Sequence, residues 1–341
     1  MKRQLALNTE YPGPNEEELA KRIAMRLRRT VEAQFLQGMT YRVPNTKTQA
    51  AVRAEFSVAP DLPEELRIGV FREARTYPAW IRFSSTLPQS KPDKAGDLRG
   101  MGLKLMGVEG PKLLPSDPNG TNHDFLFITP EVFFTSTPEV FYEFQQTGAM
   151  EASKTLAGVG KMVAFFLRHP RVLACLIRYQ IKIASLLEVP WYSSTPYLFG
   201  NRAVKYSLKP CLPPVSRIPS HPSNNYLREG LVRQLREGDA VFDFRIQFQL
   251  DPYKQPIEDA LVIWKEEDTP WHKLATLILP KQEIDSPEQM MFAENFSTSP
   301  WRCLAEHRPL GGVNRVRKLI YYEGSEYRHK RNAVPVTEPH A

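Results

Sequence analysis

"AVRAEFSVAPDLPEELRIGVFREARTYPAWIRFSS", residues 51–85, contains two runs in which apolar and polar residues partly alternate, at 51–58 and 79–85. Proline, glycine and acidic residues separate these runs. Alternation with a period of two is typical of β-strands that bury one face, and proline and glycine mark the turns between strands. The stretch therefore predicts two antiparallel strands.

Similar short runs occur in both halves of the chain. They are GMGLKLMGV (100–108), HDFLFITP (123–130), RAVKYSLKP (202–210), DAVFDFRIQFQL (239–250), DALVIWK (259–265) and LATLILP (274–280). Strands early and late, with helical patterns between them and at both ends, favour an α+β protein. We expect its centre to be an antiparallel β-barrel or a strongly bent sheet.

Two segments have helical periodicity outside these strands. Residues 15–37 begin with acidic residues and continue with basic and apolar ones, which predicts an amphipathic helix. Residues 138–189 are apolar and helical apart from a break at Pro170. In this second segment the cations Lys161, Arg168, Arg171, Arg178 and Lys182 share one sector of the helical wheel. Either the segment packs on the barrel with a charged outer face, or it makes a peripheral membrane contact.

Composition narrows the class of protein. The apolar fraction of 42% and the charged fraction of 24% are those of a soluble globular chain. The start lacks the apolar segment of a secretory signal, and the three cysteines (Cys175, Cys211, Cys303) lack metal-ligand spacing, so we expect reduced thiols and a cytoplasmic location. The net charge is +7, but the basic residues are interspersed with acidic ones along the chain. We therefore expect no nucleic-acid partner. A bound anionic cofactor explains this charge equally well.

Several common site types are absent from the sequence. The glycines of RGMGLKLMG (99–107) do not have dinucleotide-loop spacing, and the seven histidines include no zincin pair. The serines of RFSS (82–85) are not in a nucleophile elbow. Dinucleotide binding, a zinc centre and serine hydrolysis are therefore not expected.

The segment RVRKLIYYEGSEYRHK (315–330) predicts a closing helix with an unusual face. Arg317, Tyr321 and Arg328 are separated by four and seven residues, so they share that face. Cations held close to a phenol favour its phenolate form, which binds hard metal cations. A surface helix with solvated charges is the alternative.

Five segments resemble, in chain order, the haem-pocket segments of catalases. They are YRVPN (41–45), WIRFSS (80–85), GDLRGMGLKL (96–105), GTNHDFLFI (120–128) and RKLIYYEGSEYR (317–328). The resemblance covers residues 40–134 and 286–332, and the middle of the chain is more similar to short catalase-related haem proteins. It implies a catalase-like barrel over residues 40–341, with a helical insert near 138–189, a closing helix near 312–330, and residues 1–39 as an N-terminal helical arm.

The resemblance also implies roles for individual residues around a haem b cofactor. Tyr321 would be the proximal iron ligand as phenolate, a known form of haem ligation, with Arg317 stabilising its charge. Arg42, Arg82 and Arg328 would hold the haem propionates, to which guanidinium groups are suited. Ser84 and Asn122 occupy the positions of the pocket serine and the distal asparagine. Phe127 and Phe134 would pack on the porphyrin.

The distal side departs from the catalase pattern. Catalases have arginine followed three residues later by histidine, whereas this chain has Arg42 and Asn45, and no histidine precedes His123. One residue of uncertainty makes Thr46 the alternative to Asn45, and Thr48 or Gln49 are further candidates for the cavity wall. None of these is a general base near neutral pH.

Since general acid–base catalysis contributes roughly 10²- to 10⁴-fold, we expect weak disproportionation of hydrogen peroxide. The resemblance implies a haem-dependent oxidoreductase that acts on organic hydroperoxides, including those of fatty acids, by peroxidase or isomerase chemistry. A catalase or peroxidase acting on hydrogen peroxide, a non-catalytic haem carrier or sensor, and a basic membrane-surface protein without haem are the alternatives. Association into a homo-oligomer is also compatible with the resemblance.

Overall fold

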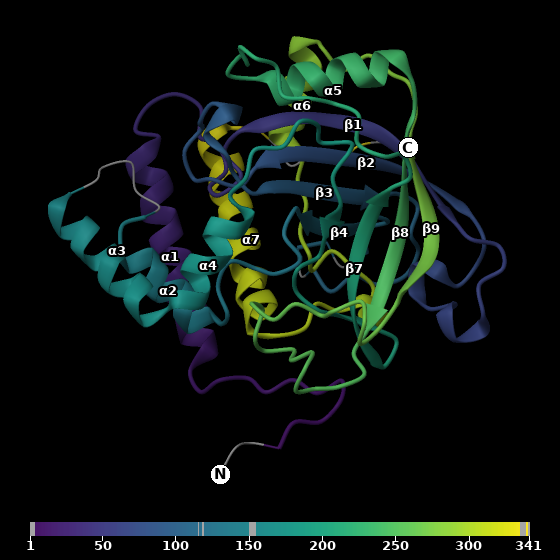
Figure 1. Cartoon of the computed structure of the whole chain (residues 1–341), viewed down its shortest axis with the longest axis horizontal. Coiled ribbons are helices and arrows are strands. Elements are labelled where there is room, and N and C mark those ends of the chain that lie inside the picture. The colour runs from purple at the N-terminus through teal and green to yellow at the C-terminus, as the bar shows by residue number, and fades with distance from the viewer. Residues whose placement is uncertain (1–3, 115, 118, 150–154, 335–338, 340–341) are drawn as a thin grey trace.

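The computed structural model describes residues 4–114, 116–117, 119–149, 155–334 and 339, and its centre is an antiparallel β-barrel (Figure 1). The strands pair in the order β4–β3–β2–β1–β9–β8–β7, and β5 pairs with both β4 and β7, which closes the ring. Short β6 pairs with the start of β7 outside this ring. The strands are β1 (Thr48–Val58), β2 (Thr76–Ser85), β3 (Arg99–Leu105), β4 (His123–Ile128), β5 (Trp191–Tyr192), β6 (Tyr197–Phe199), β7 (Arg202–Pro210), β8 (Ala240–Phe248) and β9 (Trp271–Leu279).

Aromatic side chains fill the inside of the barrel. The ring of Phe244 meets those of Phe56 and Phe125 at centroid distances of 5.1 Å, in edge-to-face arrangements that aromatic pairs favour. Because successive residues of a strand point to opposite faces, the outer face carries a different set of side chains. In β2, Phe83 belongs to the core cluster, and its neighbours Arg82 and Ser84 therefore point outward. Because the interior is packed with side chains, the polar groups of β2 that could contact a ligand lie on its outer face.

Helices cover part of that outer face (Figure 1). Their bounds are α1 (Glu16–Gln34), α2 (Pro138–Gln146), α3 (Leu156–Arg168), α4 (Pro170–Tyr179), α5 (Tyr226–Glu237), α6 (Pro287–Asn295) and α7 (Gly312–Asn332), with 3₁₀ turns η1 (Glu64–Leu66), η2 (Gly69–Phe71), η3 (Asp93–Ala95) and η4 (Ala305–His307). Figure 1 shows α1–α4 grouped on the side of α7 that faces away from the barrel. The α1 residues Ile23 and Leu27 pack against Val316 of α7 in one buried cluster.

Local sequence signals set several helix ends. The hydroxyl of Thr155 accepts a hydrogen bond from the backbone N–H of Gly158 at 3.1 Å and caps α3. Pro170 is the first residue of α4, where its missing N–H costs nothing, so the expected break lies between two helices. The start of α7 is held by Arg315, which bonds Glu16 and Glu258, the latter through Nη2 at 2.9 Å. These carboxylates tie the N-terminal segment to the closing helix.

Two sequence expectations need correction. Residues 259–265 form turns and loop rather than a strand, because the Asp259 carboxylate accepts a hydrogen bond from the backbone N–H of Leu261 at 3.1 Å. Trp264 of this segment is nevertheless buried, and it packs in a small cluster with Leu310. Helix also does not extend to residue 189, because α4 ends at Tyr179.

Two further observations concern the cysteines and membrane-spanning helices. Cys175, Cys211 and Cys303 are all free thiols, as expected. Among the described residues, every helix is too short or too polar to cross a lipid bilayer.

Candidate functional site

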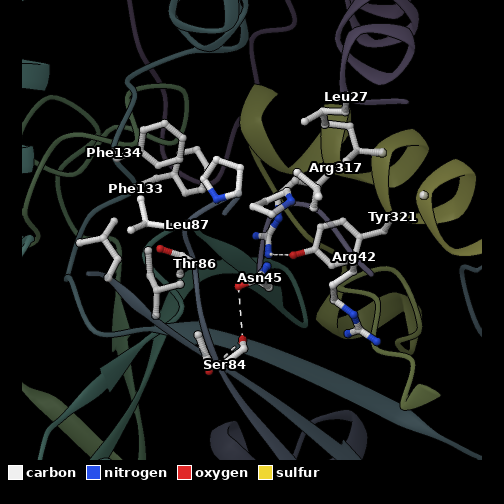
Figure 2. A pocket seen from close by; sticks show the side chains of 18 of the residues that line it. Leu27, Arg42, Asn45, Ser84, Thr86, Leu87, Phe133, Phe134, Arg317 and Tyr321 are labelled. Atoms are coloured by element: carbon white, nitrogen blue, oxygen red, sulfur yellow. Dashed lines mark hydrogen bonds between the residues drawn. The ribbon is translucent and has the colours of Figure 1, made fainter. Parts of the chain in front are cut away.

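A cavity of about 720 Å³ lies between the outer face of strands β2–β4 and the helices α1, α2, α3, α4 and α7. Its size is in the range of cofactor and small-molecule sites in proteins. Phe133, Phe134, Phe141, Phe144 and Phe166 make much of one wall apolar. Figure 2 shows Phe133 and Phe134 on the side opposite Tyr321 and Arg42, with Asn45 and Ser84 between them.

The closing helix places a tyrosine–arginine pair in this cavity. Nη2 of Arg317 donates a hydrogen bond to the phenol oxygen of Tyr321 at 3.1 Å, which Figure 2 marks with a dashed line. Nη1 of Arg317 donates to Oδ1 of the buried Asn314 at 2.9 Å, so the guanidinium is held from both sides. Burial lowers the pKa of Arg317, but its interactions with the phenols of Tyr321 and Tyr197 more than offset burial and raise that pKa. A permanent cation therefore faces the Tyr321 oxygen, as the helical spacing predicts.

Three further arginines, Arg42, Arg82 and Arg328, line the cavity next to this pair. None of them has a carboxylate oxygen within ion-pair distance among the residues described by the structure. Arg82 instead donates to backbone oxygens, including that of Ala293 at 2.9 Å, and Arg42 donates to the backbone carbonyl oxygens of Glu294 and Phe296. Nε of Arg42 and Nε of Arg328 are buried and have no hydrogen-bond partner among the residues that the structure describes.

Burial and mutual repulsion act on this arginine cluster. Burial lowers the pKa of Arg82 well below its ordinary value, and the charge of Arg42 lowers it further. Glu294 opposes this shift, Arg328 adds a smaller lowering effect, and Tyr321 opposes it least. The pKa of Arg328 is likewise lowered by burial and then by Arg42. Buried cations and orphaned N–H donors are costly unless an anion compensates them. The cluster is therefore suited to a ligand that carries carboxylates.

Of the two candidates Asn45 and Thr46, only Asn45 lies at the cavity wall. Asn45 lines the cavity, and its Oδ1 accepts a hydrogen bond from Oγ of Ser84 at 3.3 Å. Its backbone has φ 71°, in the left-handed region where asparagine is enriched. Thr46 is buried elsewhere, where its hydroxyl donates to the carbonyl of Pro88 at 2.7 Å. Thr48 accepts from Arg82, and neither Thr48 nor Gln49 lines the cavity.

Asn122 is not brought to the cavity, contrary to the expectation. It precedes β4, whose first residue His123 pairs with Leu105 and whose last residue Ile128 pairs with Gly100 beside Ser84. Six residues of strand at about 3.3 Å each put Asn122 roughly 20 Å from Ile128. The sequence alone could not show that Asn122 lies away from the cavity. Its position depends on which end of the β3–β4 hairpin the helices cover.

The two phenylalanines that were expected to pack on the porphyrin differ in their position relative to the cavity and the barrel core. Phe134 lines the cavity (Figure 2). Phe127 borders the cavity, but it belongs to the barrel core and lies 6.1 Å from the ring of Phe244. No histidine lines the cavity within the described ranges, and no cluster of His, Cys, Asp or Glu suited to a metal ion occurs there. The part of the cavity wall that the structure describes therefore offers no imidazole base.

Glycines on the outer face of β3 make room for the cavity. A Cβ on Gly100 would come within 2.8 Å of Asn45 Oδ1 and 3.0 Å of Ser84 Oγ, and one on Gly102 would come within 2.9 Å of Thr298. Both residues alternate with core positions, so they lie beside the outward-pointing Ser84 and Arg82. Alternating glycine and apolar residues signal such a close approach, although the sequence reasoning did not use it.

We expect Gly100→Ala to lower the free energy of unfolding by about 1–3 kcal/mol, because Asn45 and Ser84 must move to avoid the added methyl group. Gly230 in α5 is the matched control, since a Cβ there meets nothing within 4 Å. Gly230→Ala should raise stability by about 0.5–1 kcal/mol through helix propensity. Urea denaturation of both variants measures the difference. Equal effects of the two substitutions would contradict the close approach.

Asp97 is a second residue that the sequence reasoning missed. Its Oδ1 accepts from the hydroxyl of Thr86 at 3.0 Å, its Oδ2 accepts from the backbone N–H of Leu87 at 3.1 Å, and all three residues line the cavity. Burial raises the pKa of Asp97 to about 6, although these hydrogen bonds and the charge of Arg99 oppose the increase. The cavity wall thus contains a carboxyl that titrates in mildly acidic solution.

This pKa predicts a pH-dependent stability. The folded protein binds the Asp97 proton more tightly than the unfolded chain does, so stability should fall as pH rises from about 4 to 6, by up to ~3 kcal/mol. Asp97→Asn should remove that slope and become relatively more stable with rising pH. Urea unfolding of both proteins between pH 4.5 and 7 measures the difference. Parallel profiles would show that the carboxyl does not titrate in this window.

The chain has the catalase fold. No protein-family model matches the sequence, and a search of curated proteins finds no significant match. Among solved structures, a bacterial catalase superposes with a TM-score of 0.70 at 18% identity, covering 99% of this chain and 70% of that one. A fungal catalase gives 0.65 at 17%, covering 96% and 66%, and catalase A from Saccharomyces cerevisiae gives 0.69 at 16%, covering 98% and 70%. The expected α+β architecture is confirmed.

Proposed function

We propose that this protein is a haem-dependent oxidoreductase that converts organic hydroperoxides, with fatty-acyl hydroperoxides as its main substrate class. The observation that carries the proposal is the composition of one cavity. It combines the Arg317–Tyr321 pair, three arginines that form no ion pair with a described carboxylate, and an extended apolar wall. The catalase fold of the chain supports the same class of chemistry.

The residues present fit haem b. Haem is a flat, largely apolar ring with two carboxylates at one edge, and it needs a slot without projecting side chains. Gly100 and Gly102 keep the barrel side of the cavity flat, and the unpartnered Nε atoms of Arg42 and Arg328 are donors for carboxylate oxygens. Tyr321 supplies an oxygen ligand of a kind known for haem iron. When bound, haem would supply the iron redox chemistry that cleaves a peroxide O–O bond.

The chain's own groups would position and stabilise the reactants. Arg317 donates a hydrogen bond to the Tyr321 oxygen and would support it as an iron ligand, and Asn314 holds Arg317 in place. Ser84 binds the amide oxygen of Asn45, which leaves the amide NH₂ to donate to a hydroperoxide oxygen. Because this amide cannot accept and return a proton as an imidazole does, Asn45 orients the substrate without acting as a base.

The substrate preference follows from the cavity wall. Without a distal base, rapid disproportionation of hydrogen peroxide loses the roughly 10²- to 10⁴-fold contribution of proton transfer. The side formed by α3 and α4 presents Met162, Phe166 and Leu176, which would contact an acyl chain but offer nothing to a molecule as small as hydrogen peroxide. The proposed chemistry is therefore peroxidase or isomerase conversion of a lipophilic hydroperoxide.

A peroxide panel on haem-loaded protein tests the proposal. We expect fast loss of the conjugated-diene absorbance of a linoleate hydroperoxide and little oxygen release from hydrogen peroxide. Met162→Glu should raise the KM for the acyl hydroperoxide while leaving turnover of a short alkyl hydroperoxide unchanged. Vigorous oxygen release without lipid turnover would instead favour a catalase. Stoichiometric haem without consumption of any peroxide would favour a carrier or sensor.

A further inference from the structure

A stripe of exposed apolar side chains runs along α3. Leu156, Val159, Val163 and Leu167 are spaced by three or four residues, so they lie on one helix face, and Leu156 and Leu167 are 90% and 78% exposed. The buried Phe165 lies on the opposite face. Single exposed leucines are common on protein surfaces, but a continuous stripe of them indicates an interaction surface.

Helix α4 also carries exposed apolar side chains, and two of them line the cavity. Ile177 of α4 is 72% exposed and also lines the cavity, as does Leu173, and Ile181 just beyond the helix is 52% exposed. On α3, Met162 and Phe166 line the cavity beside the exposed stripe. Figure 1 shows α3 at the outer edge of the molecule, on the side away from the barrel. The apolar surface and the apolar cavity wall are therefore parts of the same two helices.

The charge of this segment has one sign. Residues 155–187 contain five lysines and arginines and no aspartate or glutamate. Arg168 and Arg171 pair with Glu143 and Asp259 at 3.1 and 2.8 Å. Lys161, Arg178 and Lys182 form no ion pair with a described residue.

We propose that α3 and α4 dock on an anionic lipid bilayer, with Leu156, Leu167 and Ile177 in the outer acyl region and Lys161, Arg178 and Lys182 against lipid phosphates. Helices with an apolar face and a lysine- and arginine-rich polar face bind membrane interfaces in this manner. Long cationic side chains reach the phosphates while their stems stay in apolar surroundings. The absence of acidic residues from the segment favours anionic lipid over a protein partner with mixed charge. Docking places the cavity wall next to the lipid phase.

Co-sedimentation of the full chain with vesicles tests this surface. We expect at least about tenfold tighter binding to vesicles of phosphatidylcholine with 30% phosphatidylglycerol than to phosphatidylcholine alone, decreasing with salt. The double variant Leu167→Glu/Ile177→Glu should weaken binding by at least about tenfold. The matched control is Leu212→Glu/Val215→Glu. These residues are 69% and 79% exposed, and they lie in a loop outside α3 and α4. The control should bind within about twofold of the wild type, and circular dichroism checks that both variants fold.

A second measurement reports insertion directly. In the Leu167→Trp variant, brominated acyl chains should quench the fluorescence of the introduced tryptophan, whereas in Leu212→Trp they should not add to the quenching of the native tryptophans. Absence of vesicle binding by the wild type would overturn the proposal. So would wild-type self-association that Leu167→Glu/Ile177→Glu abolishes without any vesicle binding, since the stripe would then join two copies of the chain. Neither readout requires haem or turnover, so these outcomes are independent of the proposed enzymatic function.

Discussion

Tyr321→Phe is expected to abolish the ferric tyrosinate spectrum of the haem-loaded protein and to weaken haem binding by roughly 100-fold or more. The substitution removes only the phenol oxygen that Arg317 contacts at 3.1 Å, and leaves the ring that lines the cavity. Loss of a group that merely supports a metal ligand costs 10- to 100-fold in affinity, so loss of the ligand itself should cost at least as much. Haem titration followed by Soret absorbance measures the affinity and the ligation together.

Tyr322→Phe is the matched control. Tyr322 is the adjacent residue of α7, but it is 42% exposed and does not line the cavity. Its substitution should leave both the spectrum and the affinity unchanged. If Tyr321→Phe retains the wild-type spectrum, the assignment of Tyr321 as ligand is wrong, and the proposed function fails with it.

Arg328→Met is expected to have opposite effects on the haem-free and haem-bound protein. In the haem-free protein, Arg328 is buried beside Arg42 and Arg82, and its Nε has no partner. Removing this buried cation, which forms no ion pair with a described carboxylate, should raise the free energy of unfolding by about 1–3 kcal/mol, even though its hydrogen bond to the ring of His329 is lost. Methionine fills similar space without a charge. The same change should weaken haem binding by roughly tenfold, because a propionate loses its partner.

Urea unfolding of the haem-free protein and haem titration measure the two effects of Arg328→Met separately. Lys330→Met on the same helix is the control, because Lys330 is exposed and does not line the cavity; neither quantity should change appreciably. A loss of haem-free stability in Arg328→Met would mean that the guanidinium is already compensated within the chain. Unchanged haem affinity would remove Arg328 from the propionate site.

The sequence was informative wherever a signal is local. Alternation identified the long strands, and the spacing of Arg317 and Tyr321 placed both side chains on one face of a helix that extends from Gly312 to Asn332. The same reasoning failed at 259–265, where an aspartate side chain holds the backbone in a turn despite strand-like composition. It also missed Asp97. An aspartate has a raised pKa only when it is buried, and burial cannot be read from one segment of sequence.

What the sequence by itself determined is therefore most of the elements and part of the chemical content of the cavity: an antiparallel barrel or strongly bent sheet, a closing helix with a tyrosine beside an arginine, and a chain in which no histidine precedes His123. These depend on periodicity and on residue identity. Only the tertiary structure decided which residues meet. The fold places Asn45, but neither Thr46 nor Asn122, at the cavity wall. It also brings Arg42, Arg82 and Arg328 together there, and leaves the apolar stripe of α3 exposed beside the cavity. The physical reason is that contacts between distant segments depend on strand register and on which barrel face the helices cover, and neither is encoded in a short stretch of chain.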